Sequence, residues 1–285
     1  MTERWAIITG ASRGLGQVLA VNYWAAGYSL HLIARDLEAL TRFQQTLSSS
    51  TTQQCLIHAV DLSCDQQIEL FCSKVISEQW PVHALVNNAA IHGPIGPASR
   101  ADFGLWKQTF QVDLFAAVAL CQAVVPAMIR NNYGSIINIS GGGATGPRPN
   151  FSAYACAKTA LVRFSETLAQ ELRPHKIRVN CIAPGPMPTK LLEEIIDNAS
   201  YLSPKEFELA RSTLHAPDHT MHEAAQLALY LSDPQTPYIS GKIISALWDD
   251  WRNWCDKVPL IDQSDIYTLR RIVGKDRAMA WGDKE

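Results

Sequence analysis

Short apolar runs alternate with longer amphipathic segments along most of this 285-residue chain. The runs have the length of buried strands, and the segments between them repeat apolar residues near the 3.6-residue period of a helix. The expected strands are Trp5–Thr9, Leu30–Ala34, Cys55–Val60, Val82–Val86, Ser135–Ile139, Ile177–Ile182 and Lys242–Ala246. Because strands that alternate with helices pair in parallel, we predict an α/β fold, a single doubly wound parallel sheet with helices on both faces.

The helical segments and the chain end define the predicted domain organisation. The expected helices include Leu37–Ser48, Asp65–Gln79, Phe103–Arg130, a helix from Tyr154 to Leu172, one or two helices over Leu191–Leu214 with a break near Ser203-Pro204, and Met221–Leu231. We expect one domain over residues 1–247. Residues 248–285 are rich in tryptophan and fit no further strand–helix unit, so we expect an extension that packs on its own subunit or on a neighbour.

Composition excludes several classes of function. The net charge is -2 and the pI is about 6.4, which leaves no basic surface for nucleic acid. No apolar run reaches the roughly 18 residues that span a bilayer, and the chain enters its first strand too early for a signal peptide. Seven cysteines without CxxC spacing fit free thiols in the cytoplasm. His215, His219 and His222 flank a Pro-Asp loop, so a solvated loop is a better interpretation than a metal site.

A glycine-rich turn follows the first expected strand. The segment Gly10-Ala-Ser-Arg-Gly14-Leu-Gly16 leads into a helical pattern. Alone, such a cluster is usually an ordinary turn. Between a strand and a helix, glycines allow close approach of a pyrophosphate, and the helix N-terminus offers free N–H groups to it. We therefore predict dinucleotide binding.

The end of the second strand bears on the choice of dinucleotide. An acid there would bind the ribose hydroxyls of NAD, but this chain has Ala34 followed by Arg35. Arg13, in the glycine turn, can reach the same place. Two guanidinium groups suit a 2′-phosphate, so we predict NADP(H), although either arginine alone would be an ordinary surface charge.

Tyr154 and Lys158 lie four residues apart on an expected helix, and therefore on one face of it. A tyrosine hydroxyl titrates near pH ~10, and a neighbouring ammonium group lowers that pKa toward the range where proton transfer is efficient. Alone, the pair would usually be an ordinary amphipathic contact. The other motifs make a catalytic interpretation preferable.

Together these motifs resemble the short-chain dehydrogenase/reductase family over about residues 5–246. The matching segments are Thr9 to Gly16, Asp61, Asn87-Asn88-Ala89-Ala90, Tyr154 with Lys158, Asn180 before Pro184-Gly185, and Thr189. The resemblance implies a Rossmann fold, Tyr154 as general acid/base, and Lys158 as the residue that holds the nicotinamide ribose and lowers the pKa of the tyrosine. It also implies a substrate lid at about residues 190–220, and a homodimer or homotetramer formed through the two long helices.

On this basis we assign candidate site residues. The predicted catalytic residues are Tyr154, Lys158, Asp113 and Ser140. The predicted cofactor-binding residues are Gly10, Ser12, Arg13, Gly14, Leu15, Gly16, Arg35, Asp61, Leu62, Asn88, Ala89, Ala90, Tyr154, Lys158, Pro184, Gly185, Met187 and Thr189. No metal ligand is assigned.

Two positions depart from the family pattern. The family serine thirteen residues before the tyrosine is here Gly141. Ser140, Thr145, Ser152, a water or a glycine N–H could take its place, and losing one such donor typically costs about 10²–10³ in rate. The family asparagine of the long helix is here Asp113, which could keep a water bound near Lys158.

Three hypotheses of function follow from this pattern. The first is an NADP(H)-dependent oxidoreductase that interconverts a ketone and a secondary alcohol, a cytoplasmic enzyme acting on a small molecule. The second is a non-catalytic nucleotide-binding or regulatory homologue, which the changes at Gly141 and Asp113 suggest. The third is a dehydratase or epimerase that uses the cofactor for transient oxidation. Retention of both Tyr154 and Lys158 favours the first.

Overall fold

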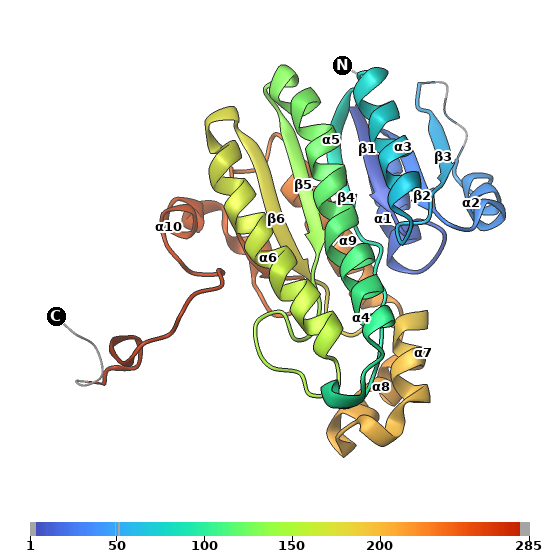
Figure 1. Ribbon diagram of the computed structural model, residues 1–285. Coiled ribbons are helices and arrows are strands. Elements are labelled where there is room, and N and C mark those ends of the chain that lie inside the picture. The colour runs from blue at the N-terminus through green and yellow to red at the C-terminus, as the bar shows by residue number, and fades with distance from the viewer. Residues whose placement is uncertain (1–3, 49, 51, 280–285) are drawn as a thin grey trace.

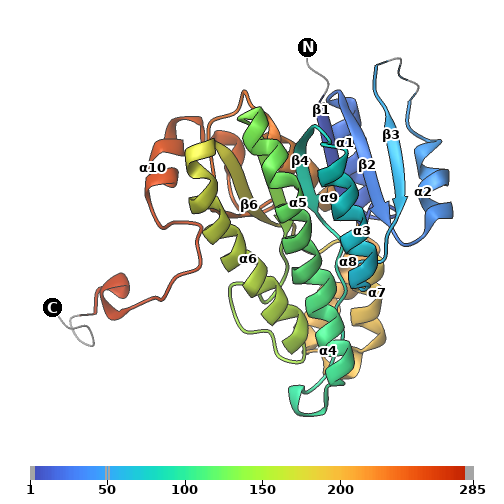
Figure 2. The same cartoon turned by 45° about the horizontal axis from the view of Figure 1, so that its top comes forward.

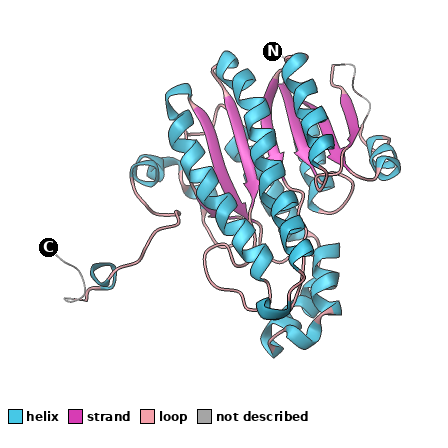
Figure 3. Ribbon diagram, in the orientation of Figure 1, coloured by secondary structure: helices cyan, strands magenta, loops and turns pink. Residues whose placement is uncertain are grey.

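The computed structural model describes residues 4–48, 50 and 52–279. Within these residues, parallel strands form one sheet in the order β3-β2-β1-β4-β5-β6-β7. The strands are β1 (Arg4–Thr9), β2 (Tyr28–Ala34), β3 (Cys55–Ala59), β4 (Val82–Asn87), β5 (Gly134–Ile139), β6 (Ile177–Ala183) and β7 (Ile243–Ser245). Each predicted strand is present, and the doubly wound parallel sheet is confirmed (Figure 3).

The two faces of the sheet carry different helices (Figure 1). The helices that cover them are α1 (Leu15–Ala25), α3 (Asp65–Ser77), α4 (Phe103–Phe110), α5 (Ala116–Asn131), α6 (Ser152–Leu172) and α9 (His219–Ser232). The helices α1 and α9 pack together on one face, and α3, α5 and α6 pack on the other. The short helix α2 (Leu37–Gln44) lies beside β3 at the sheet edge. Strand order reverses between β1 and β4, which is where folds of this kind open a ligand crevice.

The expected helix Phe103–Arg130 is present, but it is not a regular α-helix. A π-helical segment, Gln111–Phe115, separates α4 from α5 and carries Asp113. Such segments are often found at functional sites. By length and composition alone, Phe103–Asn131 could cross a membrane, with a mean hydropathy of 2.0 over its most apolar window. Half of that window is buried inside the protein, as in the core helix of a globular fold.

The predicted lid is a pair of helices, α7 (Lys190–Asp197) and α8 (Pro204–Leu214), separated by a short turn at Ala199–Tyr201. The break at Ser203-Pro204 has a local cause. The Ser203 hydroxyl accepts a hydrogen bond from the Glu206 N–H, and the Glu206 carboxylate accepts one from the Ser203 N–H. This capping box begins α8. A small apolar cluster around Phe151, Leu192 and Ile195 fixes the lid to the rest of the domain.

The chain beyond β7 packs first on its own subunit and then leaves it. Trp251 and Trp254 are buried in the core on the α1 and α9 side, followed by α10 (Val258–Gln263). Further on, Leu269 contacts α6: its carbonyl accepts from Arg163, and its N–H donates to Glu166 at 2.6 Å. The segment after Leu269 extends away from the body in both views (Figures 1 and 2).

A buried histidine on β2, His31, pairs with a partly buried one on β3, His58. His31 Nδ1 lies 3.0 Å from His58 Nε2, and the His31 ring stacks on Trp80 with centroids 3.8 Å apart. Burial lowers the pKa of His31 to about 3 and that of His58 to about 4. Both rings are therefore neutral in the folded protein over most of the acid range.

Stability should consequently fall as the pH drops from about 6.5 toward 4. Between these values the unfolded chain protonates both rings while the fold keeps them neutral, so protons favour unfolding. At pH 5 the penalty from His31 alone is about 2 kcal/mol. Unfolding by denaturant at several pH values from 7 to 4.5 measures this loss of unfolding free energy.

Two variants provide the comparison for this measurement. His31→Phe should flatten the pH dependence, whereas His215→Gln, at an exposed position, should leave it unchanged. If the unfolding free energy of His31→Phe fell with pH as steeply as that of the wild type, His31 would not be the source of the pH dependence.

Candidate active site

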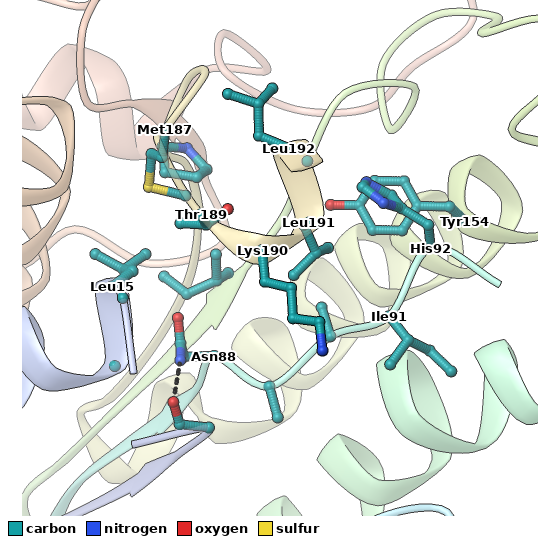
Figure 4. Close-up of a pocket in the computed structure, with 18 of the residues that line it drawn as sticks. Leu15, Asn88, Ile91, His92, Tyr154, Met187, Thr189, Lys190, Leu191 and Leu192 are labelled. Carbon is teal, nitrogen blue, oxygen red and sulfur yellow. Dashed lines mark hydrogen bonds between the residues drawn. The ribbon is translucent and has the colours of Figure 1, made fainter. Parts of the chain in front are cut away.

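A cavity of about 1100 Å³ opens at the carboxyl ends of the central strands. Its walls come from the glycine turn after β1, the loops after β2, β4, β5 and β6, and the lid helix α7. Figure 4 shows residues from several elements around it: Leu15 from α1, Asn88 and Ile91 from the loop after β4, Tyr154 from α6 and Thr189 from the turn before α7. All the predicted site residues except Asp113 line this cavity, and Asp113 lies directly behind Lys158.

The glycine turn is packed too closely for side chains. A Cβ on Gly16 would lie 2.1 Å from the Gly10 carbonyl oxygen, and one on Gly10 would lie 2.9 Å from Asn88 Nδ2. The Asn88 amide in turn donates to the Thr9 carbonyl at 2.8 Å. These contacts hold the turn against β4 and leave the start of α1 open toward the cavity.

Charged side chains from the loops after β1, β2 and β3 line the cavity. Arg13 and Arg35 both line it, and neither has a hydrogen-bond partner among the described residues. The Asp61 carboxylate accepts hydrogen bonds from the Ser63 N–H at 2.9 Å and its hydroxyl at 2.8 Å. Asp61 therefore also stabilises its own turn. The convergence of the two arginines on one 2′-phosphate stays a prediction, since Arg13 also acts electrostatically on Glu194 of the lid.

Lys158 is held in place by two groups. Its ammonium donates to the Ile139 carbonyl at 3.0 Å and lies 3.3 Å from Asp113 Oδ2. Asp113 Oδ1 accepts the Ile91 N–H at 2.9 Å. Lys158 and Asp113 are each about 1% exposed. The aspartate therefore fixes both the lysine and the loop that follows β4.

The pKa of Tyr154 is shifted in the opposite direction to the one expected. The family resemblance implied that Lys158 lowers the pKa of the tyrosine. Burial and the neighbouring Asp113 instead raise the pKa of Tyr154, against a smaller opposing effect of Arg148. The Lys158 ammonium is paired with Asp113, so its charge is largely offset at the tyrosine ring, whose centroid is 5.7 Å away. In the described arrangement Tyr154 holds its proton at neutral pH.

The position of Gly141 is filled by the tyrosine itself. A Cβ at residue 141 would lie 2.1 Å from the Tyr154 hydroxyl oxygen and 2.8 Å from Cζ. No side chain fits there while Tyr154 keeps this position. The glycine at residue 141 is thus coupled to the place of the tyrosine hydroxyl.

The side chains that could replace that serine differ in whether they line the cavity and in whether their hydroxyl is already hydrogen-bonded. Ser140 is 2% exposed and lines the cavity, and its hydroxyl has no hydrogen-bond partner in the part of the chain that is described. Thr145 also lines the cavity. The Ser152 hydroxyl instead accepts from Trp106 Nε1 at 3.3 Å. Ser140 is therefore the candidate donor that is both free and buried.

Residues His92, Arg148 and Glu194 were not predicted, although His92 and Arg148 line the cavity beside Tyr154. The His92 ring packs edge-to-face on Tyr154, with centroids 4.9 Å apart (Figure 4). Its Nδ1 lies 3.5 Å from the carboxylate of Glu194 on the lid, and this contact lowers the pKa of Glu194. His92 follows the Asn-Asn-Ala-Ala motif by two residues, a position that could have been read as part of the site.

The loop after β6 completes the cavity. Pro184, Gly185, Met187 and Thr189 line it, and Thr189 precedes α7. Gly185 has φ +86°, and a Cβ there would lie 2.6 Å from Leu247 at the start of the chain extension. Trp248 also lines the cavity. Among the described residues, no group of three or more His, Cys, Asp or Glu side chains could hold a metal ion.

Comparison with known proteins identifies the family. The short chain dehydrogenase family matches residues 4–200. The chain belongs to this family. It is 31% identical over 245 residues to the 3-oxoacyl-(acyl-carrier-protein) reductase FabG of Chlamydia trachomatis, covering 86% of this chain and 96% of the relative. The family of oxidoreductases expected from the motifs is confirmed.

Solved structures agree with this assignment. YwfH, an NADPH-dependent reductase involved in bacilysin biosynthesis, has a TM-score of 0.76 and 25% identity over 86% of this chain and 97% of that one. A metagenomic short-chain oxidoreductase in complex with NADP has a TM-score of 0.67 and 28% identity, over 85% and 96% respectively. The Rossmann fold of the short-chain dehydrogenases is thereby confirmed.

The contact between Gly141 and Tyr154 can be tested by stability. Gly141→Ala should destabilise the protein by about 1–3 kcal/mol, because the new methyl group must displace a buried tyrosine. Gly146→Ala is the matched control, since nothing lies within 4 Å of its Cβ position. Thermal unfolding of both variants measures the difference. Equal melting temperatures would show that Tyr154 moves aside without cost.

Proposed function

We propose that this protein is an NADP(H)-dependent oxidoreductase that interconverts a ketone and a secondary alcohol. The main support is that the Tyr154 hydroxyl, the Lys158 side chain and the glycine turn all face one continuous cavity. The reductase activities named for similar proteins agree with this proposal. Fold alone would not establish it, because one fold supports many functions.

The residues of the cavity fit a dinucleotide. The turn around Gly10 and Gly16 leaves the backbone bare, and the start of α1 faces the cavity, as a pyrophosphate requires. Asp61 and Leu62 would lie beside the adenine, and Asn88 to Ala90 beside the nicotinamide ribose. Lys158 and Tyr154 would bind the ribose hydroxyls, and Thr189 the carboxamide. When bound, the nicotinamide supplies or accepts the hydride.

The protein's own groups provide the proton. Burial keeps Tyr154 protonated, so its hydroxyl can donate to the substrate oxygen during reduction. Lys158 and Asp113 form the buried pair behind it and would pass on the replacement proton. The free Ser140 hydroxyl would donate a second hydrogen bond to the same oxygen. This electrostatic arrangement favours the reductive direction.

The preference for NADP(H) rests on Arg13 and Arg35. Both line the cavity and lack hydrogen-bond partners among the residues described, so both could bind a 2′-phosphate. The end of β2 offers Ala34 in place of an acid.

We also propose a cytoplasmic homodimer or homotetramer that associates through α4–α5 and α6. Phe103 and Phe115 on this helical face are 68% and 53% exposed. Exposed aromatic side chains in one stretch are typical of association surfaces.

Oxidation of NADPH with a panel of ketones tests the catalytic proposal. Tyr154→Phe should lower kcat/KM by about 10²–10⁴, because it removes the proton donor while keeping the ring. NADPH binding should persist, which fluorescence titration measures. Tight binding with no turnover above the variant would favour the non-catalytic alternative. A converted product without net NADPH consumption would indicate transient oxidation, as in an epimerase.

Arg35→Ala tests the cofactor proposal. It should lower the ratio of kcat/KM for NADPH over NADH by about tenfold or more, because a charge-assisted bond to the 2′-phosphate is lost. Arg42→Ala is the control: Arg42 lies on α2, shortly after Arg35, pairs with Glu38 and does not line the cavity. An unchanged ratio in Arg35→Ala would contradict the 2′-phosphate argument.

A further inference from the structure

Arg148 lies on the cavity wall formed by the loop between β5 and α6, beside Tyr154. Its guanidinium carbon is 3.7 Å from the centroid of the Phe151 ring, so the planar group is stacked and held in one orientation. Of the atoms around Gly142, Arg148 Nη1 lies nearest to the Cβ position, at 3.5 Å. The guanidinium therefore lies over the glycine run that precedes the tyrosine.

The hydrogen-bonding capacity of this guanidinium is largely unused. Its side chain is 20% exposed, and its contact with an acid is a long one, 3.9 Å between Nε and the Glu206 carboxylate. No hydrogen bond from Arg148 occurs within the described part of the chain. Burial lowers the pKa of Arg148, against the opposing influence of Tyr154 and Glu206. A half-buried guanidinium with free N–H groups is stabilised by an anion that enters the cavity.

The neighbouring residues leave space for such an anion. Gly141, Gly142 and Gly143 place no side chains between Arg148 and the Tyr154 hydroxyl. The arginine therefore leaves room for a ketone at Tyr154. Its Nη1 and Nη2 lie in one plane and can donate two parallel hydrogen bonds to a carboxylate. Glu206 lies on the lid side of the guanidinium. A dianionic phosphate would be repelled by Glu206 more than a carboxylate, which favours the carboxylate.

We propose that Arg148 binds a carboxylate of the substrate, so that the preferred substrates are oxo acids and the corresponding hydroxy acids. This inference rests on the proposed function, because it assigns the substrate class of the same site. The carbonyl oxygen would lie at the Tyr154 hydroxyl, and the carboxylate would extend over the glycine run to the guanidinium. Arg148 contacts the substrate away from the reacting atoms, and its role is specificity.

Matched pairs of ketones test the proposal. The probes are 3-oxobutanoate, 4-oxopentanoate and 5-oxohexanoate, each compared with its methyl ester, in NADPH oxidation by the full-length protein. We measure the ratio of kcat/KM for acid over ester. For the chain length that spans the two groups, the wild type should prefer the acid by about 10–100-fold, the range expected for a hydrogen-bonded charge pair.

Variants separate recognition of the charge from effects on catalysis. Arg148→Met should bring the ratio close to one, mainly through a higher KM for the acid, and Arg148→Lys should give an intermediate value because its ammonium lacks the fork. An indirect effect on the pKa of Tyr154 would act on acid and ester alike and cancels in the ratio. Glu206→Gln should increase the ratio, because it removes a competing carboxylate. Arg211→Met, at an exposed position on α8, is the control and should leave the ratio unchanged.

The outcomes distinguish the two proposals. An ester turned over as well as its acid at every chain length, or an acid preference that survives in Arg148→Met, overturns the carboxylate site and leaves the oxidoreductase proposal standing. No oxidation of NADPH with any acid or ester, by a protein that reduces other ketones, overturns the carboxylate site alone. No oxidation with any ketone, by a protein that binds NADPH, overturns both. Melting temperatures of the Arg148 variants show whether a loss of ratio occurs in folded protein.

Discussion

The site depends on a buried ion pair between Lys158 and Asp113. Two nearly inaccessible charges 3.3 Å apart are costly to remove from water unless each also has hydrogen-bond partners. Both have them: the lysine donates to the Ile139 carbonyl, and the aspartate accepts the Ile91 N–H. The pair therefore connects α6 with the ends of β4 and β5. Asp113 reaches this position because it lies in a π-helical segment. In a regular α-helix of the same sequence, its side chain would point in a different direction.

The same pair explains the protonation of the tyrosine. An unpaired ammonium would lower the pKa of Tyr154, but a paired one leaves burial as the largest influence, and the aspartate adds to it. The carboxylate at position 113 thus affects the protonation of Tyr154 on the neighbouring helix α6. The glycine at residue 141 belongs to the same arrangement, because the tyrosine hydroxyl lies where a side chain would otherwise be.

Much of the fold followed from periodicity, and the order of its motifs identified the family and the residues that line the cavity. Strand positions are set by local hydrophobic pattern, and glycines such as Gly10 and Gly16 are required by close backbone contacts that a strand–turn–helix context implies. The sequence did not reveal the π-helical segment, since it depends on tertiary packing around Asp113. His92 and Arg148 were missed for a similar reason. Both contact residues far away in the chain: His92 lies near Glu194, and Arg148 lies near Glu206.

Acidic side chains of the lid contact side chains of the cavity wall. The position of the lid therefore depends on which ligand the cavity holds. Glu194 on α7 meets His92, and Glu206 on α8 lies at the long distance of 3.9 Å from Arg148. Because the apolar cluster at Phe151, Leu192 and Ile195 already fixes the lid, these polar contacts need not hold it closed. They instead place two acidic side chains of the lid near the cavity wall. An anion that satisfies Arg148 weakens its contact with Glu206, so binding and the position of α8 are physically coupled.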